Sequence, residues 1–81
     1  NNTANGYNSL YFNTTNDNTA TGNLSLYSNT EGINNTANGS FSMYSNIDGS
    51  KNTANGFKSL YSNTEGSYNT AIGDYSLYSN D

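Results

Sequence analysis

Three acidic side chains recur at one position of a repeating sequence, and carboxylates gathered in this way could bind a metal ion. They are Glu31, Asp48 and Glu65. If successive repeats stack in parallel, these like charges become near neighbours and repel one another. A bound Ca²⁺ would relieve the repulsion, because hard cations favour clustered carboxylates. The alternative is a solvated turn edge, helped locally by the charge of Lys51. No other cofactor is expected.

Threonine also recurs at fixed spacing, and a regular threonine column suggests a different function. The column consists of Thr3, Thr19, Thr36, Thr53 and Thr70. Regular threonine ladders on flat β-solenoids can bind ice, usually through paired ranks. A second rank would consist of Thr14, Thr30 and Thr64, but Ile47 interrupts it. The sequence favours the alternative, in which the threonine column supports the stacking of strands.

Serine recurs without a partner that could activate it. The repeated residues are Ser25, Ser42, Ser59 and Ser76, and the chain contains no His and no Cys. Because a nucleophilic serine needs a neighbouring base, we expect no catalytic residues and predict that the chain is not an enzyme. The serines are expected to form a hydrogen-bonding ladder instead.

Glycan acceptor triplets begin at four asparagines. They are Asn1, Asn13, Asn23 and Asn34. Such triplets mark surface loops in secreted proteins. These four do not keep the phase of the repeat, and chance explains them in a chain so rich in Asn and Thr.

The element that must position all these side chains is a tandem repeat that opens with Asn-Thr-Ala. The openings lie at Asn2, Asn18, Asn35, Asn52 and Asn69, with spacings of 16, 17, 17 and 17 residues. The copies span residues 2–17, 18–34, 35–51, 52–68 and 69–81. A fixed period of this length predicts that each copy forms one coil of a stack. We therefore expect one all-β array, a parallel β-roll or narrow β-solenoid, as a segment of a longer fibre.

Glycine keeps the same frame and marks the turns of each coil. One position is occupied by Gly6, Gly22, Gly39, Gly56 and Gly73, and another by Gly32, Gly49 and Gly66. Glycine at fixed sites indicates positive φ or close approach of a neighbouring backbone. The segments between the glycines are too short for helices, and the segment containing Ser-Leu-Tyr-Ser alternates. The sequence therefore predicts two turns and two short strands in each coil.

The alternation then assigns a core, which we name the core ladder. It consists of Leu10, Leu26, Met43, Leu60 and Leu77, facing Ala4, Ala20, Ala37, Ala54 and Ala71. A third apolar side chain per coil is expected from Tyr7, Leu24, Phe41, Phe57 and Tyr75. Since three such groups bury little apolar area, hydrogen bonds between coils and ladders of Asn must also contribute.

Tyrosine follows leucine in every copy and is predicted to point the other way. These residues are Tyr11, Tyr27, Tyr44, Tyr61 and Tyr78. An aromatic row on the outside of a thin coil is unfavourable in water, and a partner chain would cover it. The row is therefore the candidate interface of a homo-oligomer.

Composition and charge exclude several classes of partner. Only 31% of residues are hydrophobic, which alone is typical of disorder, but the strict phase of Leu, Tyr and Gly predicts a folded chain. The net charge is −4 with two lysines, so we expect no nucleic-acid partner and no attraction to anionic membranes. No apolar run approaches the ~20 residues of a membrane span, so no membrane insertion is expected.

The phrase G-x-x-N-T-A-x-G-x-x-S-L, found at residues 49–60 and 66–77, resembles the head repeat of trimeric autotransporter adhesins. Related repeats occur in tail-fibre and appendage proteins of phages and bacteria. The resemblance covers essentially the whole chain and implies a left-handed parallel β-roll of three chains side by side. The adhesin unit is shorter than the present one, so the outer turn here is longer and the cross-section differs.

These features together predict a structural or adhesive segment of an extracellular fibre, on a cell-surface appendage or a virion. Its partners would be further copies of itself, as a homotrimer, and a host-surface or matrix ligand on the repetitive outer face. A monomeric solenoid that stacks head to tail into a filament is the alternative, since neither end has a polar cap.

Overall fold

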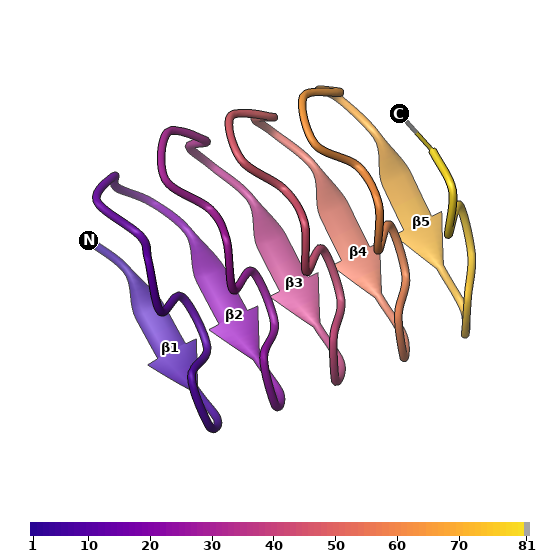
Figure 1. The fold of residues 1–81 in the computed structure, drawn as a ribbon, viewed down its shortest axis with the longest axis horizontal. Helices are drawn as coiled ribbons and strands as arrows, with labels where there is room; N and C mark the ends of the chain where they lie inside the picture. The colour runs from indigo at the N-terminus through magenta and orange to yellow at the C-terminus, as the bar shows by residue number, and fades with distance from the viewer. Residues whose placement is uncertain (81) are drawn as a thin grey trace.

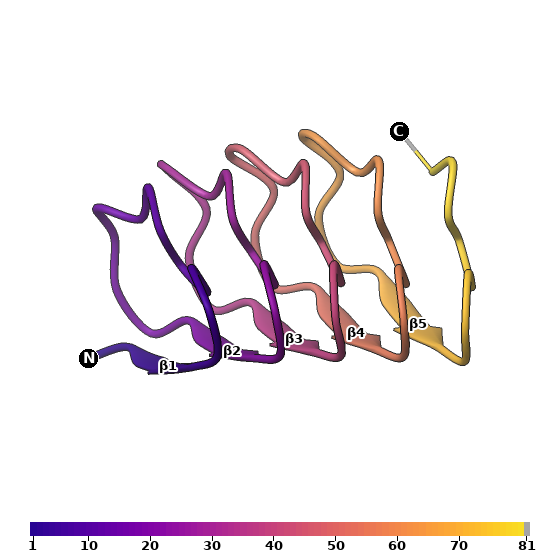
Figure 2. The ribbon, with the colours of Figure 1, turned by 60° about the horizontal axis from the view of Figure 1, so that its bottom comes forward.

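The structure, a computed structural model, describes residues 1–80 as a stack of coils with five parallel strands in one sheet (Figure 1). The strands are β1 (Thr3–Asn5), β2 (Thr19–Thr21), β3 (Thr36–Asn38), β4 (Thr53–Asn55) and β5 (Thr70–Ile72). They lie side by side in chain order along one side of the stack (Figure 2). The predicted fold class, a parallel β-solenoid of 17-residue coils, is confirmed. Asp81, the last residue of the fifth copy, lies outside the described residues.

The register of the sheet places equivalent repeat positions side by side. Thr19 pairs with Thr36 and Thr36 pairs with Thr53, and the alanines that follow pair in the same way. The first copy is one residue short, yet Thr3 still pairs with Thr19. Identical side chains therefore form columns along the axis, because parallel pairing without slippage preserves the repeat phase. Residues 1–80 contain no helix long and apolar enough to cross a membrane.

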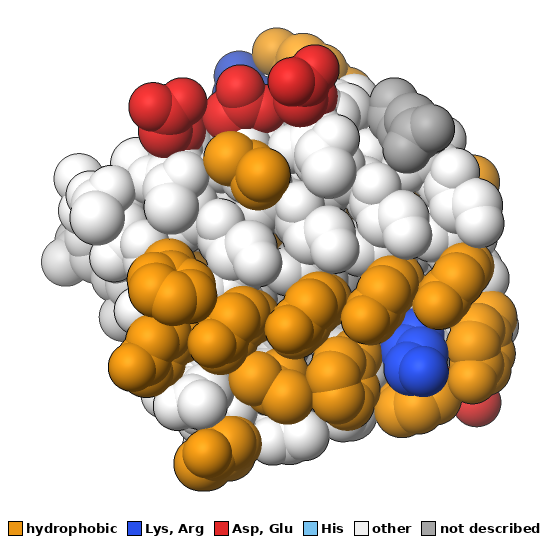
Figure 3. Space-filling view, viewed as in Figure 1, with side chains coloured by type: hydrophobic (Ala, Val, Ile, Leu, Met, Phe, Trp, Pro, Cys, Tyr) orange, Lys and Arg blue, Asp and Glu red, His pale blue; other side chains and the backbone are white. Residues whose placement is uncertain are grey.

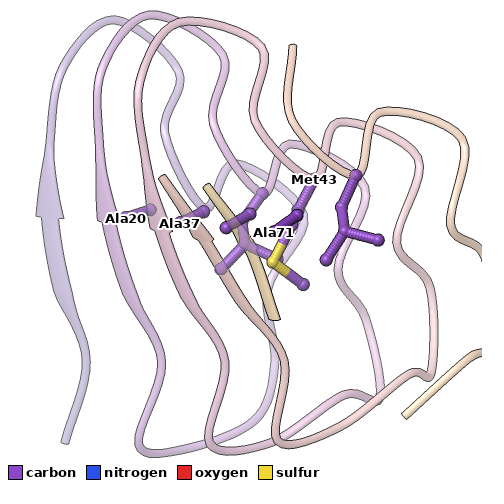
Figure 4. Packing of buried hydrophobic residues seen from close by; sticks show 7 residues of the cluster. Ala20, Ala37, Met43 and Ala71 are labelled. Carbon is purple, nitrogen blue, oxygen red and sulfur yellow. The ribbon is translucent and has the colours of Figure 1, made fainter. Parts of the chain in front are cut away.

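The core is a thin file of side chains inside the coils (Figure 4). Alanine enters from the strands, and Leu26, Met43 and Leu60 enter from the opposite wall with 0% of their surface exposed. Ala20, Ala37 and Ala54 are equally buried. The core ladder weakens toward its ends: Ala4 is exposed, Leu10 is half-buried and Leu77 is 45% exposed. Each core residue is thus covered mainly by the coils above and below it.

The expectation of two strands per coil is wrong, because the Ser-Leu-Tyr-Ser segment is not extended. Leu26, Met43 and Leu60 have φ values of 48°, 51° and 49°, and the residue two positions earlier is also left-handed in each coil. Because left-handed residues alternate with residues in other conformations, this segment forms an irregular wall of the coil and not an extended β-strand. The wall still bonds to the next coil, as in the 2.9 Å bond from Leu26 N–H to the Ser42 carbonyl.

The two glycine positions serve different purposes. Gly22, Gly39 and Gly56 have φ between 123° and 140°, a region that L side chains rarely adopt. Gly49 has no such φ, but a Cβ there would collide with the carbonyl oxygen of Gly66 and with Asn46 Oδ1. One glycine therefore permits a turn, and the other permits close contact between successive coils.

Two columns of buried asparagine line the coil beside the apolar file. The first contains Asn18, Asn35 and Asn52, and the second contains Asn29, Asn46 and Asn63, all with at most 1% exposure. In the second column each amide donates to the preceding side-chain oxygen, for example Asn46 Nδ2 to Asn29 Oδ1 at 2.8 Å. The same nitrogen donates to the Gly49 carbonyl at 2.9 Å. These columns satisfy polar groups that would otherwise be costly to bury.

Candidate functional site

A tyrosine ladder runs along the wall of the solenoid that lies across the core from the sheet. Its members are Tyr11, Tyr27, Tyr44, Tyr61 and Tyr78. Successive rings are stacked, with centroids 5.0 to 5.4 Å apart and interplanar angles of 6 to 10°. Tyr11 is exposed and the other four are half-buried. The ladder exists because every coil repeats the same backbone, so each ring meets its equivalent in the next coil.

A second column of aromatic rings lies against the tyrosine ladder. Phe41 is 5.5 Å from the Tyr44 ring, and Phe57 packs edge-on against Phe41 and Tyr75 at 6.4 and 5.6 Å. These rings, with Tyr7 and Leu24, were expected to line the core, and that expectation is wrong. Tyr7 and Tyr75 are 72% and 53% exposed, while Leu24 and Phe41 are half-buried. The cause is geometric, since the interior is already filled by the alanine, leucine, asparagine and serine columns.

Lys58 lies within this second column. Its ammonium nitrogen is 5.3 to 5.8 Å from the ring centroids of Phe41, Phe57, Tyr61 and Tyr75. Sequence reasoning missed this residue as part of the aromatic surface. The signal was present, because Lys58 occupies the repeat position of Phe41 in the previous copy and of Tyr75 in the next. A cation over several ring faces is held by their quadrupoles while its charge still reaches water.

We name this surface the aromatic face and define it by the tyrosine ladder together with Phe12, Phe41, Phe57, Lys58 and Tyr75. A band of hydrophobic side chains runs along the axis on this side of the molecule, with a basic side chain inside it (Figure 3). The interior tyrosine rings stack on one another along the axis, so each ring face is turned toward the ring of a neighbouring coil. No pocket is present among residues 1–80. The aromatic face is therefore suited to lateral contact with a similarly flat surface.

The acidic column remains in solvent. Glu31, Asp48 and Glu65 are all exposed, and acidic side chains gather along one edge of the view in Figure 3. The described residues contain no group of three His, Cys, Asp or Glu side chains that could hold a metal ion. Lys51 lies against Tyr68 instead, with its ammonium nitrogen 3.4 Å from the tyrosine hydroxyl.

The two threonine ranks lie in different surroundings. Thr3, Thr19, Thr36, Thr53 and Thr70 each begin a strand and are exposed in register on the sheet. Thr14, Thr30 and Thr64 lie outside the strands, and the Thr14 hydroxyl donates to the Thr30 carbonyl at 2.8 Å. The residues of the proposed second rank are therefore not on the flat sheet that carries the first.

The repeated serines form the expected ladder through their backbone carbonyls, which accept bonds from the preceding coil, whereas their hydroxyl groups bond within their own coils. The hydroxyl groups of Ser25 and Ser59 each donate to the carbonyl three residues earlier, at 3.1 Å, and Ser76 does so at 2.8 Å. Ser42 Oγ is buried without a partner. In these three copies the hydroxyl bond closes the turn that follows the positive-φ glycine.

The acceptor asparagines differ in exposure. Asn1, Asn23 and Asn34 are exposed, whereas Asn13 is half-buried. The Asn13 side chain accepts from Asn29 Nδ2 at 2.7 Å and donates to the Thr15 carbonyl at 2.8 Å. Its amide therefore belongs to the asparagine column and is engaged on both sides.

No family model, curated protein or solved structure matches the chain.

Proposed function

We propose that the chain is a structural and adhesive segment of an extracellular fibre, either a cell-surface appendage or a virion fibre, in which copies associate side by side through the aromatic face. The observation that supports this most is the continuous tyrosine ladder with its second aromatic column. Soluble monomers rarely expose a contiguous apolar surface of this kind, and such patches mark interaction sites. Tyrosine supplies large contact area with little loss of conformational entropy.

A second copy is the partner that fits best, because its aromatic rings recur with the same axial spacing. Two or three copies aligned along one axis would therefore match ring for ring through all coils. Closed symmetric association of this kind is the common arrangement of homo-oligomers. The resemblance of the repeat to adhesin heads and to tail-fibre repeats supports three copies. Attachment to a host or matrix ligand would use the outer surfaces left uncovered.

The mass of the chain in solution, measured by sedimentation, tests the proposal. We expect a discrete trimer that dissociates when Phe41 and Tyr75 are replaced by Asn. Asn is the matched choice, because Asn8 occupies this repeat position in the first copy with φ 53°, close to the 61° and 59° of Phe41 and Tyr75. Asn tolerates the left-handed conformation well, so the coil should be retained. A control variant, Tyr68→Ser, removes an exposed ring outside the aromatic face. A wild-type chain that stays monomeric at every concentration would exclude the proposal.

Head-to-tail stacking into a filament is the second candidate, favoured by the uniform bonding between coils. The bond from the threonine N–H to the next asparagine carbonyl is 2.8 to 2.9 Å at every step from Thr3 to Thr53. Within residues 1–80, β1 and β5 are the outer strands of the sheet, and an unpaired outer strand is a template for the same pairing. This candidate predicts an open-ended polymer whose length grows with concentration and that persists in the Phe41→Asn, Tyr75→Asn variant.

A further inference from the structure

We propose that the outer surface of the five-stranded sheet binds ice. We name this surface the threonine face. It consists of Thr3, Thr19, Thr36, Thr53 and Thr70 in one rank and of Asn5, Thr21, Asn38, Asn55 and Ile72 in the other. The inference goes beyond the fibre proposal and does not depend on it, since the aromatic face lies on the opposite wall.

The geometry of the two ranks follows from the three-residue strands. In β3, Thr36 and Asn38 are exposed while Ala37 between them is fully buried, and β4 repeats the pattern. Alternation thus directs two side chains per coil outward. Neighbours within a rank are ~4.8 Å apart, and the two ranks are two residues, or about 6.6 Å, apart. The result is a two-dimensional array of side chains that are polar except for Ile72, and its second rank is not the predicted rank of Thr14, Thr30 and Thr64.

Rigid support lies directly beneath this lattice. The N–H of Asn35, one residue before β3, donates to Asn18 Oδ1 at 3.0 Å, and the N–H of Asn52 donates to Asn35 Oδ1 at 3.0 Å. Thr19 and Thr36 N–H groups then bond to the next coil at 2.8 Å. Strands β2, β3 and β4 are therefore held by a backbone bond at their first residue and by the asparagine column one residue earlier. Threonine is also stiff at χ1, so its hydroxyl and methyl groups keep a defined spacing.

The chemistry of the threonine face fits a neutral water lattice better than a charged partner. None of its ten residues carries a charge, although the chain has two basic and six acidic residues. Threonine combines a hydroxyl that anchors water with a methyl that restricts its orientation, and asparagine adds both donors and acceptors. Ordered waters bridging such groups cost little free energy when the groups are already fixed. A regular array of this kind can order the first layer of water molecules, and that ordered layer can then join the lattice of an ice crystal.

The test is thermal hysteresis and inhibition of ice recrystallisation by the intact chain. We expect wild-type activity that Thr36→Lys abolishes, because a lysine in the centre of the rank disrupts both spacing and neutrality. The matched control is Asn34→Lys, which adds the same side chain two residues earlier. Copy 3 carries Lys51 at that repeat position, so the coil accepts it. Asn38→Thr, which reproduces the Thr19–Thr21 pair in β3, should raise the activity.

Circular dichroism on all variants separates loss of binding from loss of fold. A wild-type chain without thermal hysteresis overturns the proposal, as does a folded Thr36→Lys variant with unchanged activity. The Phe41→Asn, Tyr75→Asn variant, which should not associate laterally, is expected to keep its ice activity. Failure of the fibre proposal and failure of this one are therefore distinguishable.

Discussion

The backbone N–H of Asn35 donates to the side-chain oxygen of Asn18 in the coil before it, 3.0 Å away. The same Asn18 side chain donates through Nδ2 to the Gly32 carbonyl at 3.0 Å. One buried amide thus joins two coils and closes the turn between them. The relationship recurs from Asn52 to Asn35 and from Asn69 to Asn52. A chain with few apolar residues obtains much of its structural definition from this polar column.

Replacing Asn35 by Ala should destabilise the fold strongly. The substitution leaves the buried Asn52 N–H without its acceptor, whereas the Gly49 carbonyl loses its 2.8 Å donor but keeps the bond from Asn46 Nδ2. A buried group left unsatisfied costs about 1–3 kcal/mol, so we expect a loss of that size in the free energy of unfolding. Urea denaturation followed by circular dichroism measures this. Asn38→Ala, an exposed Asn in the same copy, is the control and should stay within about 0.5 kcal/mol of wild type. Equal effects of the two substitutions would contradict the role given to the column.

Gly49→Ala should separate neighbouring coils, although its backbone conformation is ordinary. The added methyl would meet the Gly66 carbonyl and Asn46 Oδ1, neither of which can move without disturbing a hydrogen-bonded column. Overpacking of a rigid site costs about 1–3 kcal/mol, and the asparagine bonds broken here add to this. The neighbouring substitution Asp48→Ala, on an exposed side chain, should have little effect. A melting temperature of Gly49→Ala equal to that of Asp48→Ala would show that the coils tolerate the methyl.

Tyr44→Ser should lower the free energy of unfolding of the solenoid, although Tyr44 lies on its surface. Tyr44 stacks on Tyr27 and on Tyr61, each at 5.3 Å. Aromatic pairs contribute about 0.5–1.5 kcal/mol each, so the loss should be about 1–3 kcal/mol. Near-ultraviolet circular dichroism should lose intensity, since the coupled array is divided into two shorter ones. Tyr68→Ser removes an unstacked ring and should change neither quantity appreciably; a comparable loss there would mean that stacking is not the cause.

Calcium should leave the stability of the chain unchanged. The carboxylates of Glu31, Asp48 and Glu65 are exposed and remain in solvent. Titration calorimetry should therefore record only heats of dilution, and the melting temperature should be the same with Ca²⁺ and with chelator. A saturable heat that disappears in a Glu31→Gln, Glu65→Gln variant would restore the calcium site as a proposal.

The sequence by itself predicted the architecture, because a fixed repeat period implies that successive copies stack as equivalent coils. Asn-Thr-Ala every 17 residues placed alanine above alanine, and the register confirms that equivalent positions pair. The in-frame glycines marked the turns for the same reason. The columns of buried side chains follow from only two conditions, the phase of the repeat and the burial of apolar side chains away from water.

Tertiary structure decided what the phase leaves open, namely the path of the backbone within each coil. Four alternating residues around Leu26 suit a strand or a left-handed wall equally well, and only contact with neighbouring coils selects the wall with φ 48° at Leu26. The burial of Asn18 and Asn29 depends on partners supplied by other coils, so the sequence predicted that asparagine forms ladders but not that these side chains are buried. With asparagine inside, Phe41 and Tyr75 were left on the surface beside the tyrosines. The same backbone path made Asn38, rather than Thr30, the outward neighbour of the Thr36 rank.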